Sequence, residues 1–226
     1  HSILFMVDGT FNTPYLMAPV KNGVNIIIHS LTKWMGGHGV AIAGVVVDGG
    51  NFDWGCTDKF PTISAPHYAM DGINFYEEFG PVAFTAKFRA EAMYNFGPSL
   101  APMNAFHILQ GLETLPLRMQ RHIENTRELL KFLKSHKQIS WVRHPSLTDH
   151  PQHQLAAKML PRGAGSIITF GINGGRDAGK KFIETVTLSS HLANVGDAKT
   201  LVIHPASTTH SHIDSQSMLS AGLTDD

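Results

Sequence analysis

Four residues just past two apolar runs have side chains that could do chemistry together. Lys33 follows the run at 24–28 and the hydroxyl residues Ser30 and Thr32, and Asp8 follows the run at 3–7. A lysine amine is a useful nucleophile only if its pKa is lowered or its nitrogen is held as an imine, and a position beside a buried strand suits both. Ligands collect at the carboxyl ends of strands in α/β sheets, so Asp8 and Lys33 could face one pocket.

Together these side chains have the chemistry of a pyridoxal 5'-phosphate (PLP) site. The cofactor needs a Schiff-base lysine, an acid for its pyridinium nitrogen and a cup for its phosphate. The hydroxyls of Ser30 and Thr32, with loop N–H groups at 36–39, could form that cup. Spacing alone is a weak signal, and by spacing alone a solvated Lys33 with Asp8 capping a turn is the more common arrangement.

The elements expected to position these residues are those of an α/β fold. The apolar runs at 3–7, 24–28 and 40–47 lack polar alternation, as do strands covered on both faces. Residues 49–81 predict a long loop with one short helix. Apolar residues at helical spacing predict helices over 82–96 and 102–137, the second interrupted at Pro116.

From about residue 139 the pattern changes to that of a smaller α+β layer. We expect a short helix within 144–165 and a domain boundary near 138–144. The chain therefore divides into a partial large domain (1–140) and a partial C-terminal small domain (141–226). Short strands are predicted at 139–142, 166–172 and 200–204, and a helix at 179–193.

Composition and charge narrow the classes of partner. The chain has 18 basic and 18 acidic residues, which argues against nucleic acid or an anionic membrane surface as the main partner. No apolar run approaches the roughly 20 residues that span a bilayer. The single cysteine, Cys56, excludes an internal disulfide and favours a reducing compartment, hence the cytoplasm.

The histidines do not form a metal-binding pattern. There are 14 of them, but neither HExxH nor Cys-x-x-Cys occurs, so loop or capping roles are the better interpretation and no metal site is predicted. Both ends of the chain look cut from something longer, because an apolar run begins almost at once and no element closes the C-terminus.

Five blocks of sequence, in order and spacing, resemble the Cys/Met-metabolism group of PLP enzymes. That group includes cystathionine synthases and lyases, methionine γ-lyase and O-acetylhomoserine sulfhydrylase, and the run at 48–54 with the aromatic loop after it looks most like the sulfhydrylase branch. The blocks are VDGTFNTPYL (7–16), NIIIHSLTKWMGGHG (25–39), VVVDGGNFDW (45–54), GLETLPLRMQRH (111–122) and HPASTTHS (204–211).

The resemblance implies a role for each candidate residue. Lys33 would hold PLP as a Schiff base and move protons between substrate carbons. Asp8 would pair with the pyridine nitrogen, and Ser30 and Thr32 would bind the phosphate. Asn194 stands where the family places a contact to the substrate carboxylate.

The resemblance also implies a fold and a reaction. It implies a large domain with a mostly parallel sheet covered by helices on both faces, and a homotetramer built as a dimer of dimers. The reaction would be a γ-replacement that turns O-acetylhomoserine and sulfide into homocysteine and acetate, in methionine biosynthesis. The alternative is a related cystathionine or methionine γ-lyase.

The sequence departs from the family pattern in ways that put activity of this chain in doubt. Gly9 stands where the family usually has Asn. The family's N-terminal phosphate loop, its stacking aromatic residue and its main carboxylate-binding arginine are not in the 226 residues. A non-catalytic fragment of such an enzyme is therefore a third hypothesis.

Overall fold

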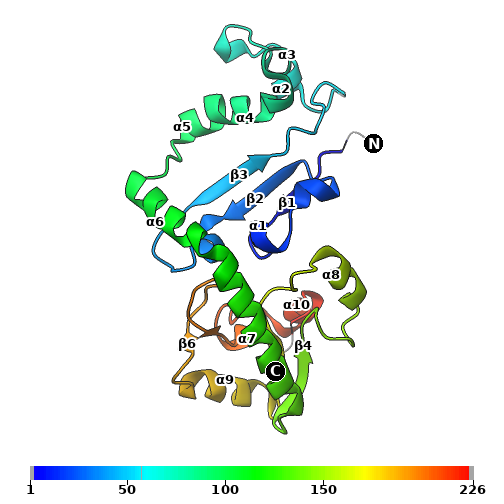
Figure 1. The fold of residues 1–226 in the computed structure, drawn as a ribbon, viewed down its shortest axis with the longest axis vertical. Coiled ribbons are helices and arrows are strands. Elements are labelled where there is room, and N and C mark those ends of the chain that lie inside the picture. The colour runs from blue at the N-terminus through cyan, green and yellow to red at the C-terminus, as the bar shows by residue number, and fades with distance from the viewer. Residues whose placement is uncertain (1–2, 57, 224–226) are drawn as a thin grey trace.

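The computed structural model describes residues 3–56 and 58–223, and its N-terminal half is built on a three-stranded sheet (Figure 1). The strands lie in the order β1 (Met6–Asp8), β2 (Ile26–Ser30) and β3 (Gly44–Asp48), and confirm the three predicted strands. β1 is parallel to β2, but β3 is antiparallel to it, so the described part is not mostly parallel. The segment 31–43 reverses the direction of the chain between β2 and β3 instead of crossing over the sheet.

Two short helical elements connect β1 to β2 and close one side of the sheet. They are α1 (Thr13–Leu16) and the single turn η1 (Pro19–Asn22), each with a proline in its first turn, where a missing N–H costs nothing. Leu16 of α1 is buried in the core. α1 therefore packs in the same cluster as Leu31 and Trp34, which stand on either side of Lys33 along the chain.

Aromatic side chains order the segment after β3 into a lobe at the top of Figure 1. Trp54 is 2% exposed and contacts the rings of Phe52, Phe60 and Phe84. These rings bury one another, so the segment contains more helical turns than the single short helix predicted for 49–81. These turns are α2 (Pro61–Ser64), η3 (Tyr68–Met70), α3 (Phe75–Phe79) and η4 (Gly80–Val82). The helix predicted over 82–96 is confirmed by the consecutive helical elements α4 (Ala83–Lys87), η5 (Phe88–Met93) and α5 (Tyr94–Phe96).

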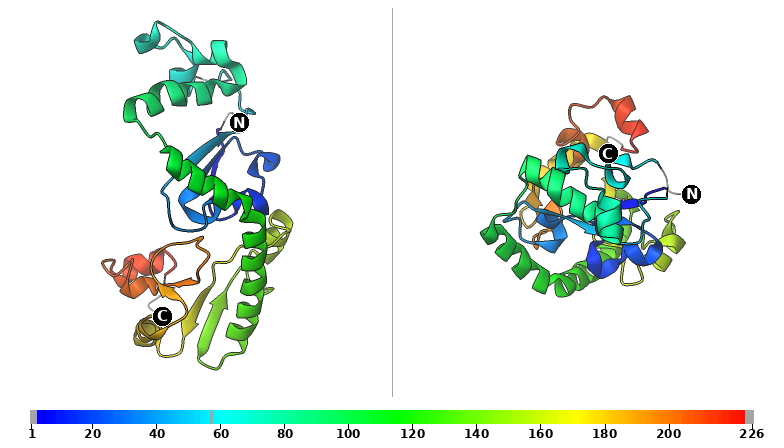
Figure 2. Two further views of the ribbon diagram at one scale, coloured as in Figure 1. Left: turned by 60° about the vertical axis from the view of Figure 1, so that its left-hand side comes forward. Right: turned by 90° about the horizontal axis from the view of Figure 1, so that it is seen from above.

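Two long helices, α6 (Pro102–Glu113) and α7 (Leu115–Ser135), join the halves of the molecule (Figure 2). The break between them at Thr114 confirms the interruption predicted at Pro116, which is tolerated only in the first turn of a helix. Met119 packs in the core below the sheet, whereas the far end of α7 packs on the next strand of the chain. α7 is therefore shared by both halves.

The C-terminal half is a small α+β layer. Its elements are β4 (Ile139–Arg143), α8 (His153–Met159), β5 (Thr169–Ile172), α9 (Gly175–Thr185), β6 (Ser190–His191), β7 (Leu201–Val202), η6 (Pro205–Ser207) and α10 (Ser215–Ser220). β4 and β5 pair antiparallel, and β6 and β7 pair parallel. The predicted boundary between residues 140 and 141 falls inside β4, and the two-domain division stays a prediction.

The helix predicted at 179–193 is wrong at both ends. α9 begins at Gly175, after Gly174 in the left-handed region (φ 106°), and ends at Thr185, because Val186 is extended. Leu188, which lies within the range predicted as helix, is 94% exposed, and the chain then forms β6. The apolar residues after 185 therefore belong to a strand and its approach rather than to the helix.

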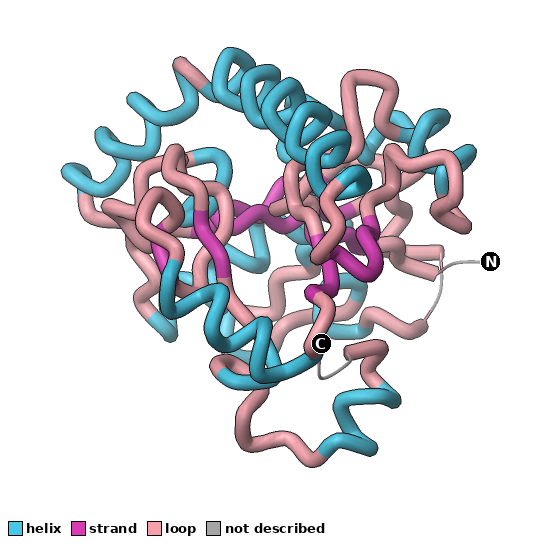
Figure 3. The backbone as a smooth tube through the Cα atoms, turned by 90° about the horizontal axis from the view of Figure 1, so that it is seen from below, coloured by secondary structure: helices cyan, strands magenta, loops and turns pink. Residues whose placement is uncertain are grey.

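Strands lie in the middle of the molecule with helices around them (Figure 3). Two buried clusters hold the N-terminal half together, one on each face of β2. Ile26 joins the aromatic cluster around Trp54, and Leu31 joins the cluster that contains Trp34 and Met119. Residues of the turn that carries Lys33 are thus themselves part of the cluster that contains Trp34 and Met119.

Candidate active site

Lys33 lies in a wide helical turn, η2 (Leu31–Met35), that follows β2 directly. Its backbone (φ −91°, ψ −129°) leaves helical values, so the turn kinks at this residue. The N–H groups of Gly36 and Gly37 close the turn by donating to the carbonyls of Leu31 and Lys33 at 2.9 and 2.8 Å. These two amides are therefore used within the turn, which removes them from the expected phosphate cup. Lys33 itself stands half-buried past the carboxyl end of β2.

Asp8 ends the strand beside the one that leads to Lys33. It lies opposite Ile28 in the parallel ladder, so its side chain is on the same face of the sheet as Ser30. Its Oδ1 accepts a hydrogen bond from the Thr10 N–H at 2.9 Å. Hydrogen bonds from the side chain and the backbone of Thr10 hold the pKa of Asp8 below its ordinary value. The carboxyl therefore stays ionised, as a partner of a protonated ring nitrogen must.

Thr10 joins the two strand ends, although the sequence analysis did not single it out. Its hydroxyl oxygen accepts a hydrogen bond from the Ser30 N–H at 2.8 Å, and the hydroxyl hydrogen-bonds to Asp8. The residue is 5% exposed, so these bonds are shielded from water. The spacing Asp-x-Thr, which forms a turn around the aspartate side chain, was the signal that could have found it.

One of the two predicted phosphate-binding hydroxyls is engaged within the protein. Thr32 Oγ1 donates to the Ala43 carbonyl at 3.2 Å and accepts from the Ala43 N–H at 3.0 Å. A hydroxyl has one proton, so Thr32 must release Ala43 before it can donate to a phosphate. The Ser30 side chain is half-buried on the face that carries Asp8. The phosphate roles of both residues stay predictions.

Residues 194–198 of the C-terminal half pack on the turn η2, which we call the lysine turn because it carries Lys33. We call residues 194–198 the docking segment. Lys33 Nζ donates to Asn194 Oδ1 at 2.5 Å, and the Ala198 N–H donates to the Gly37 carbonyl at 3.0 Å. Gly196 has φ +81°, and a Cβ there would lie 2.3 Å from Trp34 N. The docking segment therefore fits only with glycine at this position. The structure brings Asn194 to Lys33, and the predicted contact of Asn194 with the substrate carboxylate stays a prediction.

Arg118 of α7 hydrogen-bonds to the backbone of the lysine turn and holds it against the helix, and we call this set of contacts the Arg118 brace. Its guanidinium donates to the carbonyls of Trp34, Met35 and Gly111 at 2.8, 3.3 and 2.6 Å. A Cβ on Gly37 would lie 2.2 Å from Arg118 Nη1. The glycines after Lys33 therefore make room for an arginine, and this second residue missed from the sequence fixes the turn to α7.

His29 explains how the chain accommodates Gly9 where the family usually has Asn. A Cβ on Gly9 would lie 2.6 Å from His29 Cε1 and 3.2 Å from an Ile27 methyl. The imidazole thus fills the space beside the Gly9 backbone. His29 is 4% exposed, and burial lowers its pKa. The ring is therefore neutral near pH 7 and adds no charge beside Asp8.

The remaining histidines and the helices form neither a cluster of metal ligands nor a membrane span within residues 3–56 and 58–223. Within 3–56 and 58–223, no three side chains of His, Cys, Asp or Glu are grouped as metal ligands. His204 Nδ1 hydrogen-bonds the Ser207 hydroxyl at 2.8 Å, a local loop contact. No helix in the same residues has the length and apolar character needed to cross a bilayer.

The geometry can now be compared with known proteins. The model of a family described as "Cys/Met metabolism PLP-dependent enzyme" matches residues 1–226. The chain belongs to this family. Within the Cys/Met-metabolism PLP family, homocysteine synthase of Schizosaccharomyces pombe is 46% identical over 223 residues, 98% of this chain and 52% of the relative. O-acetyl-L-homoserine sulfhydrylase of Leptospira meyeri is 44% identical, over 97% of this chain and 51% of the relative. The chain thus spans about half the length of the curated relatives it matches.

Solved structures of the family have the same fold. An O-acetylhomoserine (thiol)-lyase assigned in Campylobacter jejuni, crystallised with N'-pyridoxyl-lysine-5'-monophosphate, superposes with a TM-score of 0.93 at 33% identity, over 100% of this chain and 54% of that one. Cystathionine γ-synthase of Xanthomonas oryzae, in complex with aminoacrylate and cysteine, gives 0.75 at 27% identity, over 98% and 49%. These neighbours confirm the α/β fold class.

The described residues fit the PLP of the family. A half-buried amine at the end of β2 and a carboxyl of lowered pKa at the end of β1 stand on paired strands. Lys33 would hold the cofactor, Asp8 would face its ring nitrogen and Ser30 would face its phosphate. The cofactor supplies an electron sink for carbanions beside an amino group. Thr32 fits only after its bonds to Ala43 rearrange.

Proposed function

We propose that the protein to which this chain belongs replaces the acetyl ester of O-acetylhomoserine with sulfide, giving homocysteine and acetate. The observation that carries the proposal is the hydrogen bond between Lys33 and Asn194 in a chain 46% identical to a homocysteine synthase. In the proposal, Lys33 is the amine that carries protons and Asn194 the amide that binds the substrate carboxylate. The substrate is thus a small amino acid whose carboxylate is held beside Lys33.

Lys33 has the central role in the proposed reaction. Its Nζ takes the α-proton of the substrate, and a further proton leaves the β-carbon as acetate is expelled from the γ-carbon. Hydrosulfide then bonds to the γ-carbon, and the β- and α-carbons each regain a proton. The kink at Lys33 gives the side chain a fixed starting point, and the Arg118 brace keeps the turn from shifting. Asn194 holds the substrate carboxylate by donating from its side-chain NH2 group, while its Oδ1 accepts from Lys33.

Asp8 acts on the reaction through charge. Its ionised carboxylate keeps a facing ring nitrogen protonated and so favours loss of the substrate α-proton. Thr10 maintains that ionisation through its two hydrogen bonds. Ser30 and, after rearrangement, Thr32 bind the phosphate and set the position of the ring over Lys33.

Three further features belong to the same proposal. We propose a homo-oligomer, a dimer of dimers, in which subunits share their sites. We propose that the protein works in the cytoplasm on sulfide, which agrees with the free thiol of Cys56. We also propose that residues 1–140 are part of the cofactor-binding domain and 141–226 part of the small domain, with the docking segment linking them.

The test compares two lysines. The purified protein is incubated with PLP, O-acetylhomoserine and sulfide, and homocysteine is measured by mass spectrometry. Lys33→Ala should lower the rate by about 10³-fold or more and abolish cofactor trapped on the chain by borohydride reduction. The exposed Lys21→Ala should change neither. Homocysteine formation and trapped cofactor in Lys33→Ala would contradict the proposal.

The choice of acceptor separates the proposed reaction from its relatives. The similarity to cystathionine γ-synthase supports a second candidate in which cysteine replaces sulfide. Cysteine in place of sulfide tests for cystathionine, and methionine or cystathionine alone tests for elimination to a keto acid. Turnover with sulfide should exceed turnover in the other arms. No turnover in any arm, with cofactor bound, would favour the non-catalytic fragment.

A further inference from the structure

Two segments of the C-terminal half pack on the core of the N-terminal half. One is the docking segment, whose Val195 packs against the cluster that contains Trp34 and Met119. The other is residues 160–163, which follow α8 and which we call the α8 loop. Its Leu160 packs against the same cluster. Because β5, α9 and β6 lie between the two segments along the chain, they are separate attachments of the C-terminal half.

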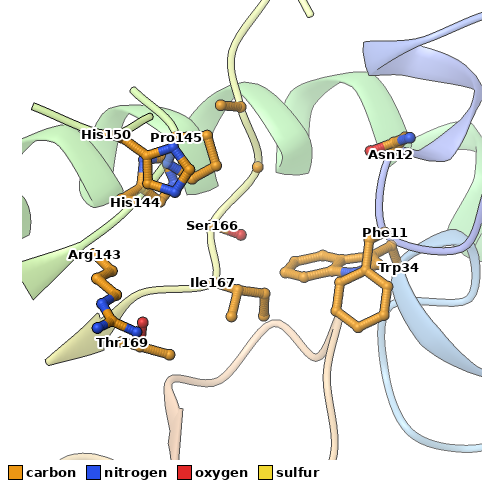
Figure 4. A pocket seen from close by; sticks show the side chains of 12 residues that line it. Phe11, Asn12, Trp34, Arg143, His144, Pro145, His150, Ser166, Ile167 and Thr169 are labelled. Atoms are coloured by element: carbon orange, nitrogen blue, oxygen red, sulfur yellow. The ribbon is translucent and has the colours of Figure 1, made fainter. Parts of the chain in front are cut away.

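A cavity of about 350 Å³ lies between the two halves beside these attachments (Figure 4). Phe11 and Trp34 line it from the N-terminal half, and His144 and Ser166 line it from the C-terminal half. Gly196 of the docking segment approaches the backbone of Trp34, and the α8 loop shortly precedes Ser166 along the chain. Since this space separates the halves, their relative position depends on the segments that pack beside it.

Arg162 of the α8 loop contacts the N-terminal half through its side chain. Its Nη1 donates to the Tyr15 carbonyl of α1 at 2.8 Å, and its guanidinium carbon lies 4.9 Å from the centre of the Tyr15 ring. The guanidinium is attracted to the π electrons of the ring, and its planar shape lets it stack there while it donates. We call these two contacts the Arg162 clasp. The clasp joins residues that lie 147 positions apart.

The backbone beside Arg162 is also held against the N-terminal half. Gly163 has φ +136°, and a Cβ there would lie 2.7 Å from Cδ1 of Ile123 on α7. Ile123 belongs to the cluster against which Leu160 packs. The Gly163 N–H donates to the Leu160 carbonyl at 2.9 Å, which closes the α8 loop on itself. Arg162 therefore reaches α1 from a backbone that is already fixed on α7.

We propose that Arg162 is a positioning residue for the candidate active site, and that its clasp sets the arrangement in which Asn194 reaches Lys33. A connecting helix alone leaves two domains free to move relative to each other, so further attachments must fix the C-terminal half. The clasp holds α1, whose Leu16 is buried in the same cluster as the lysine turn. Loss of the clasp therefore moves the equilibrium towards an undocked form, by about tenfold for a stacked, hydrogen-bonded guanidinium.

Amide hydrogen exchange of the full chain, followed by NMR, tests the proposal without substrate or cofactor. The Ala198 N–H donates to the Gly37 carbonyl at 3.0 Å, so it is protected while the docking segment stays on the lysine turn. We expect Arg162→Met to speed its exchange by about threefold to tenfold. Arg162→Lys keeps the charge without the planar stack and should have a smaller effect. Arg121→Met, at an exposed arginine of α7, should have none.

Two other amides separate positioning from a merely structural role. The Gly163 amide reports on the α8 loop itself, and the Leu31 amide, which donates to the Ala43 carbonyl at 2.9 Å, reports on the N-terminal half. Faster exchange at Gly163 with no change at Ala198 would mean that the clasp acts only locally. Equal acceleration at Leu31 and Ala198 would mean a general loss of stability. Either result would overturn the proposal.

The effect of the clasp on turnover rests on the proposed function. With PLP, O-acetylhomoserine and sulfide, Arg162→Met should raise KM by about threefold to tenfold with a smaller change in kcat, because substrate binds only the docked fraction. Tyr15→Phe keeps both the ring and the carbonyl and should match the wild type. A lowered kcat with unchanged KM would contradict the positioning role. If the wild type forms no homocysteine, the proposed function fails while the exchange at Ala198 still decides the role of Arg162.

Discussion

Lys33 Nζ and Asn194 Oδ1 lie 2.5 Å apart, although 161 positions separate the two residues. The contact joins a turn of the N-terminal half to the docking segment of the C-terminal half. Neither side chain is positioned by its own element alone, since Lys33 depends on the Arg118 brace and Asn194 on the fit of Gly196. The site therefore exists only when the two halves are docked.

Removal of the Asn194 amide should weaken substrate binding more than it slows chemistry. We expect Asn194→Ala to raise KM by about 10–100-fold with a smaller change in kcat, because a lost contact to the substrate carboxylate is present in both ground and transition states. Asn194→Asp should instead lower kcat, since its charge would hold the Lys33 ammonium in an ion pair. Steady-state kinetics distinguish the two, with the exposed Asn22→Ala as control.

Gly196 should tolerate a side chain far less well than Gly23, a glycine with the same backbone conformation. Gly196→Ala adds a Cβ 2.3 Å from Trp34 N at φ +81°, whereas Gly23→Ala at φ +83° meets nothing within 4 Å. We expect Gly23→Ala to cost about 1 kcal/mol from backbone strain alone and Gly196→Ala about 3 kcal/mol or more. Urea unfolding measures both, and equal losses would contradict the tight fit of the docking segment.

Arg118 should matter for stability as well as for the site. Arg118→Met leaves the carbonyls of Trp34, Met35 and Gly111 without their donor, and we expect a loss of about 3 kcal/mol in the free energy of unfolding. Arg121→Met removes an exposed ion pair with Glu124 and should cost about 0.5 kcal/mol or less. A similar loss in both variants, by thermal or urea unfolding, would contradict the brace.

The sequence predicts the strands and the position of Lys33 well because these depend on local patterns. Three uninterrupted apolar runs, each followed by a polar residue, predict the strands. They also predict the strand ends at which the candidate site residues lie. The break near Pro116 is predicted for the same reason, since the ring constraint is local. The family resemblance adds a substrate-carboxylate role for Asn194, and the contact of Asn194 with Lys33 is seen only in the structure.

What the sequence does not predict depends on contacts between distant residues. Thr10 and Arg118 matter through partners on other elements. The aromatic lobe folds because Trp54 meets Phe84, which spacing along the chain cannot show. α9 ends at Thr185 although apolar residues continue along the chain, because those residues lie in the extended segment that leads to β6.

Buried histidines should make stability fall on acidification. Burial lowers the pKa of His29, His122 and His144 below the ordinary 6.5, so each binds a proton more readily in the unfolded chain. Their stabilisation is complete above about pH 6.5 and is lost as pH falls towards the folded-state values, by up to about 1.4 kcal/mol per pH unit for each ring. Urea unfolding from about pH 7 to 5 should show a shallower loss in His122→Gln, and the wild-type slope in the exposed His107→Gln. Equal slopes in all three proteins would show that His122 does not titrate on unfolding.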